Sequence, residues 1–146
     1  MFALSEQVKI STALAYASGT ADRTGAILDT ADYDGVLIVV AFATIAAGCA
    51  TTVKAQESDA PAMGDAADLL GTGIAVAADD DGQVFYLDVF KPQKRYLRVY
   101  VDKDASNASG ETALYFQYGP KVEPIVNTVT DLVTGELHLS PIAGTA

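Results

Sequence analysis

Apolar and polar residues alternate with a period of two along most of this chain, and the 3.6-residue period of an amphipathic helix is scarce. Val8, Ile10, Thr12 and Leu14 alternate with polar or small neighbours, which predicts a first strand with one buried face. Turn residues separate further runs of this kind at short intervals. The later strands are expected at residues 26–30, 36–43, 51–56, 83–90, 96–101 and 112–118.

The repeated short strands predict an all-β protein built as a sandwich or a barrel. Residues 36–43 are apolar at every position, which fits a central strand that is covered on both faces or shared with an interface. In other strands the alternation indicates the side chains that face the core. These are Phe85, Leu87 and Val89, then Leu97, Val99 and Val101, then Leu114 and Phe116.

Two segments depart from this pattern. Residues 61–70 contain the one short helix that the sequence favours, weakly amphipathic through Met63 and Leu70 and ended by the glycines that follow. After Pro120, apolar residues continue without a clear period, and this is the second segment. We therefore expect a sandwich domain over residues 1–120. Residues 121–146 are expected to form a C-terminal hairpin of the same domain or an arm that docks on a neighbour.

Charge narrows the range of partners. The 146 residues include 19 acidic and 9 basic side chains, a net charge of −10. Such a chain repels nucleic acid, whose binding depends on neutralising phosphates, so no nucleic-acid partner is expected. The charge is also uneven, which is typical of two solvated faces or of complementary surfaces on neighbouring copies. Residues 55–90 hold no Lys or Arg, and five basic residues then follow closely: Lys91, Lys94, Arg95, Arg98 and Lys103.

The sequence also argues against a membrane segment and a signal peptide. The longest apolar run, residues 36–43, continues toward Cys49 through Thr44 and small residues, and it is too short for a helix that spans a bilayer. The N-terminal stretch carries Glu6 and lacks a long apolar region. We expect synthesis in a cytoplasm and no membrane partner.

Candidate catalytic residues are few. Cys49 is the only cysteine, so no internal disulfide can form, and its Ala- and Gly-rich surroundings are typical of a small buried hydrophobe. His138 is the only histidine, and a nucleophile would have to meet it in space because no nucleophile motif is present. We predict no enzyme activity; a hydrolase that uses Cys49 or His138 is the weakest hypothesis.

Acidic turns are the candidates for a cation site. Asp79, Asp80 and Asp81 are adjacent, and Asp102 and Asp104 open a stretch with oxygen ligands at alternate positions, as a calcium loop does. That stretch lacks the glycine and the glutamate that a calcium loop carries at its sixth and twelfth positions. Because exposed acidic turns usually hold no metal, these five aspartates are weak calcium candidates and no cofactor is predicted.

Three polar stretches stand out from the strand pattern. They are Arg23-Thr24-Gly25 followed by Leu28-Asp29-Thr30 and Tyr33, then Lys54-Ala55-Gln56-Glu57-Ser58-Asp59, then Lys94-Arg95-Tyr96-Leu97-Arg98. Over roughly residues 5–120 the chain resembles, in these stretches and the strands around them, the small structural proteins of tailed-bacteriophage heads called capsid decoration or cement proteins. The C-terminal residues lie outside the resemblance.

The resemblance implies a jelly-roll-like β-sandwich on the outer surface of an assembled capsid, commonly as a homotrimer at local threefold positions. The partner would be the major capsid protein, and the location would be the outside of the virion. Tyr and Arg are enriched in protein interfaces, and an apolar tail can add a strand to a neighbour's sheet. The candidate interface residues are therefore Tyr96, Arg98 and Tyr100 on one side of a strand, and Val126, Leu137 and Leu139 in the tail.

These observations together favour a structural virion protein that stabilises a capsid by bridging its subunits. Binding the assembled lattice better than separate subunits would stabilise the lattice by linkage. A sandwich-type carbohydrate-binding or host-adhesion module is the alternative, suggested by the acidic turns and by seven tyrosines.

Overall fold

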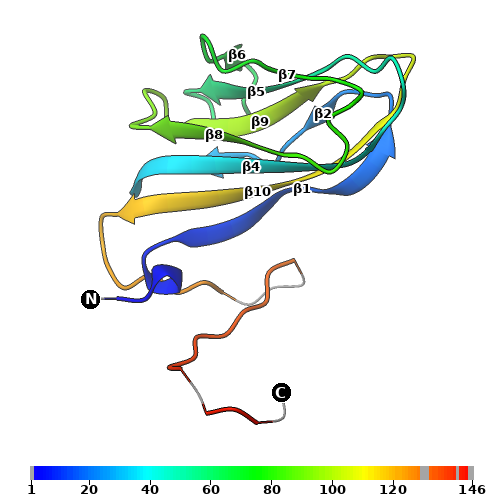
Figure 1. Ribbon diagram of the computed structural model, residues 1–146. Coiled ribbons are helices and arrows are strands. Elements are labelled where there is room, and N and C mark those ends of the chain that lie inside the picture. Colours follow the sequence, from blue (N-terminus) through cyan, green and yellow to red (C-terminus); the bar gives the residue numbers. More distant parts are fainter. Residues whose placement is uncertain (1, 129–131, 141, 145–146) are drawn as a thin grey trace.

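Two antiparallel sheets pack face to face in the computed structural model, which describes residues 2–128, 132–140 and 142–144 (Figure 1). A short 3-10 helix, η1 (Leu4–Glu6), precedes them. The first sheet contains, in spatial order, β1 (Lys9–Gly19), β10 (Ser109–Pro120), β4 (Tyr33–Ile45) and β8 (Val84–Phe90). The second contains β2 (Arg23–Thr24), β3 (Leu28–Asp29), β9 (Tyr96–Asp102), β5 (Thr51–Ser58), β6 (Ala67–Asp68) and β7 (Ile74–Val76).

The strand order is that of a jelly roll. β2 and β3 both pair with β9, and β6 and β7 both pair with β5, so each couple forms one interrupted strand. Counted this way, eight strands have the order 1-8-3-6 in the first sheet and 2-7-4-5 in the second. Two interleaved Greek keys of this kind define the jelly roll, and the predicted all-β sandwich is confirmed.

The core lies between the two sheets and follows the alternation of the sequence. Val36, Ile38 and Val40 of β4 point into it, and Leu97, Val99 and Val101 of β9 meet them from the second sheet, as predicted for β9. The predicted inner side of β8 is also confirmed, because Phe85, Leu87 and Val89 pack against this core while the residues between them are exposed.

Two predictions of strand facing are wrong. In β10 the core side carries Ala113, Tyr115 and Gln117, so Leu114 and Phe116 face outward. Both sides of this strand carry large apolar residues, and alternation alone therefore could not decide which side is buried. Tyr115 decides it, because its hydroxyl reaches across the core, accepts from the Val99 amide at 2.9 Å and donates to the Ala26 carbonyl at 2.8 Å.

The single buried face predicted for the first strand is also wrong. Ile10 and Thr12 pair with the outward Phe116 and Leu114, whereas Leu14 pairs with the inward Ala113. The register shifts between Thr12 and Leu14, and one extra residue at this bulge moves the following side chain to the other face.

The predicted helix at residues 61–70 does not form. Met63 is buried with a φ of 52°, a left-handed backbone conformation that interrupts a helix. Ala67–Asp68 then forms β6 on the edge of β5, and Leu70 is fully exposed. The apolar stripe was too weak to outweigh this pairing with an open sheet edge.

The described part of residues 121–146, here called the C-terminal segment, contains no strand. Figure 1 shows it in orange to red, leaving the sandwich beside β1 and ending away from both sheets.

Candidate interaction surfaces

The outer side of β5 and β9 is a surface of polar side chains, here called the polar face. The register places Lys54 beside Tyr100 and Gln56 beside Arg98. All its members are partly buried except Asp102, which is exposed. The polar face comprises Thr52, Lys54, Gln56, Tyr96, Arg98, Tyr100 and Asp102.

Lys54 lies at the centre of the polar face. Its Nζ is 2.8 Å from Asp68 Oδ2 and 3.6 Å from Asp102 Oδ2, and it lies 5.1 Å from the centre of the Tyr100 ring. The hydrogen bond with Asp68 raises the pKa of Lys54, and the same bond lowers the pKa of the Asp68 carboxyl. Both groups thus keep their charges over a wide pH range.

The predicted interface residues Arg98 and Tyr100 are occupied within their own molecule. Arg98 Nε donates to Gln56 Oε1 at 2.8 Å, and the Gln56 amide donates in turn to Asp68. The Tyr100 hydroxyl donates to Asp22 Oδ2 at 2.9 Å, and this bond is the main reason for the raised pKa of Tyr100. A partner that engaged these side chains would have to replace contacts that already exist.

The three polar stretches singled out in the sequence contact one another. Arg95 binds the Asp29 carboxylate through Nε and Nη2, at 2.7 Å for the shortest pair. This contact lowers the pKa of Asp29. Lys94 Nζ lies 3.6 Å from Asp59. These residues link strand ends of the second sheet, so their spacing in the sequence reflects the fold.

Arg23, from the first of these stretches, makes a buried contact with residues outside them. Glu111, 0% exposed, accepts from Arg23 Nη1 at 2.8 Å and lies 2.9 Å from Lys103 Nζ, whose side chain is 1% exposed. Lys103 also donates to the Ser109 and Gly19 carbonyl oxygens. This cluster joins β1, β2 and β10 with the loop after β9; the sequence singled out Arg23 but did not predict its pairing with Glu111.

The calcium candidates lie in two separate turns. Asp80, which follows Asp79, accepts hydrogen bonds from the Ala77 amide and the Gln83 side chain within its own turn, and Asp81 accepts one from the Ile45 N–H at the end of β4, at 2.5 Å. Asp104 does the same in the turn after β9, and Asp102 faces Lys54 on the polar face. Among the residues that the structure describes, no three His, Cys, Asp or Glu side chains gather closely enough to hold a metal ion.

Cys49 and His138 contact different groups. Cys49 is buried, as predicted, and its Sγ lies 3.3 Å from Thr51 Oγ1 and 3.4 Å from the Asn107 carbonyl oxygen. His138 is exposed on the C-terminal segment, with Nε2 2.8 Å from Glu136 Oε2. The Cys49 thiol and the His138 imidazole therefore have separate partners and do not contact each other.

The outer side of the first sheet, here called the apolar face, differs sharply from the polar face. Its rows follow from the register: Ile10, Phe116 and Leu37 lie side by side, and so do Leu114, Val39 and Tyr86 in the next row. Val84, Tyr86 and Phe90 are 62%, 67% and 61% exposed. The apolar face comprises Ile10, Thr12, Leu37, Val39, Ala41, Val84, Tyr86, Asp88, Phe90, Thr112, Leu114, Phe116 and Tyr118.

Asp88 is the one acidic residue on the apolar face, in a chain with 19 acidic residues. It accepts a hydrogen bond from the Tyr118 hydroxyl at 2.5 Å. Burial, followed by this contact with Asp88, raises the pKa of Tyr118 to about 12. Apart from Asp88, a partner could cover the apolar face without removing a charged group from water.

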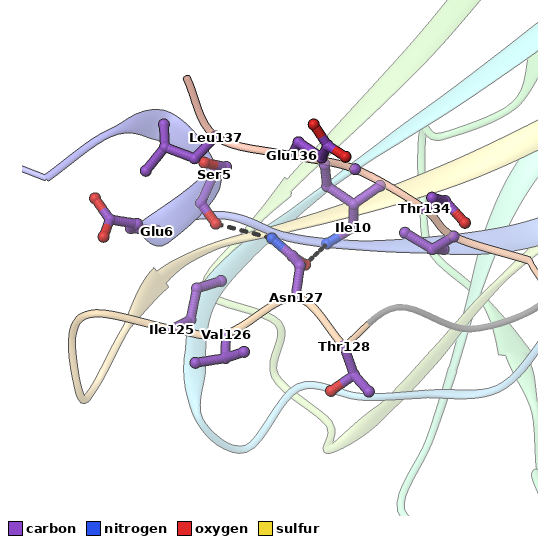
Figure 2. A pocket seen from close by; sticks show the side chains of 12 residues that line it. Ser5, Glu6, Ile10, Ile125, Val126, Asn127, Thr128, Thr134, Glu136 and Leu137 are labelled. Atoms are coloured by element: carbon purple, nitrogen blue, oxygen red, sulfur yellow. Dashed lines mark hydrogen bonds between the residues drawn. The ribbon is translucent and has the colours of Figure 1, made fainter. Parts of the chain in front are cut away.

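The C-terminal segment is attached beside the apolar face. Asn127 accepts from the Ile10 amide at 2.9 Å and donates to the carbonyl oxygens of Ser5 and Val8, as Figure 2 shows for Ser5 and Ile10. The Ile125 amide donates to the Glu6 carbonyl oxygen. Between the segment, η1 and β1 lies a pocket of about 350 Å³, whose walls include Ser5, Glu6, Ile10, Ile125, Val126 and Leu137.

The sequence contained a signal for the apolar face. The uniform apolar run at 36–43 was expected to be covered on both sides or shared with an interface. The second sheet covers its inner side, whereas Leu37, Val39 and Ala41 on its outer side remain partly exposed. The pattern could not reveal that Ile10 and Phe116 extend this surface, because both had been expected to face the core.

No family model and no curated protein matches this chain. It is similar to a solved structure of Bacillus endospore appendages, described as a novel family of disulfide-linked pili. That match has 17% sequence identity and a TM-score of 0.43, and it covers 81% of this chain and 95% of the other. A likeness this distant carries no argument about function. No helix among the described residues is long and apolar enough to cross a membrane.

Proposed function

We propose that this chain is a non-enzymatic structural protein of a tailed-phage head, which binds the outer surface of the assembled capsid and bridges subunits of the major capsid protein. The observation that carries the proposal is the apolar face. A strongly acidic chain leaves one whole side of a sheet, from β1 to β8, almost free of charge. Exposed apolar patches of this extent mark protein contacts.

The choice of a capsid as the partner rests on the resemblance of the polar stretches, and of the strands around them, to capsid decoration proteins of tailed phages. The net charge of −10 agrees with it, because an acidic protein is better placed outside a shell than against packaged DNA. Bridging requires that the protein bind the assembled lattice more tightly than separate subunits. The lattice is then stabilised by the difference in binding free energy, repeated at every site.

The test uses the full chain and expanded phage heads that lack a decoration protein. Sedimentation should show saturable binding at a fixed ratio to the capsid subunits, and the temperature at which the heads break should rise with occupancy. Unexpanded heads provide the control, because a protein that bridges the expanded lattice should bind them less well. Heads that take up no protein at saturating concentration would overturn the proposal.

A further inference from the structure

Two apolar regions of this chain are left in solvent, and they lie next to each other. One is the apolar face, with Tyr86 and its neighbours on β8. The other is the C-terminal segment, on which Val126, Leu139 and Ile142 are 82%, 92% and 94% exposed. Each region would gain free energy from burial of its side chains, on the order of 1.5–3 kcal/mol for each large aliphatic residue that is fully covered.

Ile10 connects the two regions. It lies in a row of the apolar face with Phe116 and Leu37, and it also forms part of the pocket wall opposite Val126 and Leu137. The segment therefore starts at the margin of the apolar face.

Residues 132–137 of the segment also lie beside β1, because the Thr12 hydroxyl donates to the Leu132 carbonyl oxygen at 3.4 Å and Leu137 lines the same pocket as Ile10. Beyond Leu137 the segment runs away from the sheet in its own copy (Figure 1), and the β8 side of the face stays exposed.

We propose that the C-terminal segment of one copy docks on the apolar face of a second copy. The contact goes beyond the proposed function, since it requires no capsid. Donor and acceptor are different surfaces of the chain, so the association is heterologous and continues from copy to copy until it closes into a ring. The homotrimer expected from the sequence is one such ring.

The length of the segment is sufficient for this contact. The 15 residue-to-residue steps from Asn127 to Ile142 can span up to about 50 Å when extended. Four strands at a spacing of about 4.8 Å make the apolar face less than about 20 Å wide. A segment that gives up the contacts of residues 132–137 with its own β1 and stays held at Asn127 can therefore reach a neighbouring copy and still cross its sheet.

Charge favours a segment over direct stacking of two apolar faces. Stacked sheets lie about 10 Å apart, close to the screening length at moderate ionic strength, so two bodies of net charge −10 would repel each other. An extended segment buries apolar side chains while the two acidic bodies stay farther apart. Between copies of this chain, the partner of the apolar face is thus a segment that carries few charges. An extended segment covers only a strip of this face, and the remainder would meet the capsid.

The test compares the association of four full-length chains by sedimentation velocity over a concentration series. Tyr86→Asp places a charge on the apolar face, and the double variant Leu137→Asp, Leu139→Asp does so on the segment. Leu70→Asp is the matched control, because Leu70 is a fully exposed apolar residue outside both regions. The parent and Leu70→Asp should associate alike, and the other two chains at least tenfold more weakly. Thermal unfolding by circular dichroism checks that each variant folds, and Val84→Asp replaces Tyr86→Asp if that variant does not.

Mixing the two weakened variants gives the sharpest result. One retains an intact segment and the other an intact apolar face, so together they should form one-to-one pairs although each alone is monomeric. A parent chain that stays monomeric at millimolar concentration, association that survives in the segment variant, or a mixture without pairs would each overturn the proposal. Self-association without binding to phage heads would instead overturn the proposed function and leave this contact standing.

Discussion

The two outer faces of the sandwich are built from opposite kinds of side chain. On the polar face, Lys54, Arg98 and Tyr100 are each held by a neighbour within the molecule. On the apolar face, Val39, Val84 and the other aliphatic side chains have no polar groups to satisfy, and Val84, Tyr86 and Phe90 are largely exposed to solvent. Charged and aromatic residues that attract attention in the sequence thus serve the fold, whereas the surface available to a partner consists of ordinary apolar residues.

The comparison implies that the polar stretches stabilise the monomer, most of all where they are buried. Replacing Glu111 by Gln tests this with the largest expected effect. The substitution removes the negative charge between Arg23 and Lys103 and leaves the ammonium group of Lys103, 1% exposed, without its counter-ion. Breaking a buried ion pair in this way costs about 3–5 kcal/mol in free energy of unfolding.

Urea unfolding followed by circular dichroism would measure the loss. Glu136→Gln is the control, because Glu136 is exposed on the C-terminal segment and pairs there with His138. Its effect should stay within about 0.5 kcal/mol. A Glu111→Gln protein as stable as the parent would contradict the structural role of the Arg23 stretch.

Gly25, in the first polar stretch, provides a second test of the role of these stretches in the fold, with an intermediate expected loss of stability. A Cβ atom at this position would lie 2.6 Å from both the Tyr115 hydroxyl oxygen and Val99 Cγ1, and neither residue has room to move because both are completely buried. Gly25→Ala should therefore lower the free energy of unfolding by about 1–3 kcal/mol. Gly64→Ala, where a Cβ meets no atom within 4 Å, should change it little in the same urea titration. Equal effects of the two substitutions would show that Gly25 is not needed for close packing.

These examples also show what could be predicted from the sequence. Alternation identified β8 and β9 with the correct inner faces, because the inner side of each is apolar at every position, whereas the outer side includes a charged residue, Asp88 in β8 and Arg98 in β9. It failed in β10, where Leu114 and Tyr115 are both large, and in β1, where a bulge changes the face. The apolar face itself depends on both of these strands. Its extent follows from the register of four strands, and a pattern read along one strand contains no register.

The exposed ion pairs on and beside the polar face, Lys54 with Asp68 and Arg95 with Asp29, should contribute the smallest effect on stability, which its pH dependence measures. The pKa of Asp68 is lowered chiefly by its hydrogen bond with Lys54, and that of Asp29 chiefly by Arg95, both from an ordinary value of 3.8. A carboxyl whose pKa is lower in the folded than in the unfolded state adds stability above the unfolded pKa, and this stability is lost as pH falls through the folded pKa. Thermal unfolding should therefore shift to lower temperature below about pH 4. Asp68→Asn and Asp29→Asn should each flatten that decline, by less than about 1 kcal/mol because both carboxylates are about half exposed. The difference in stability between the parent and each variant should shrink in 1 M salt, which screens exposed pairs.

If either substitution lowered stability as much as Glu111→Gln, these exposed pairs would be as important to the fold as the buried cluster. The side chains of the polar face would then be even less free to bind a partner.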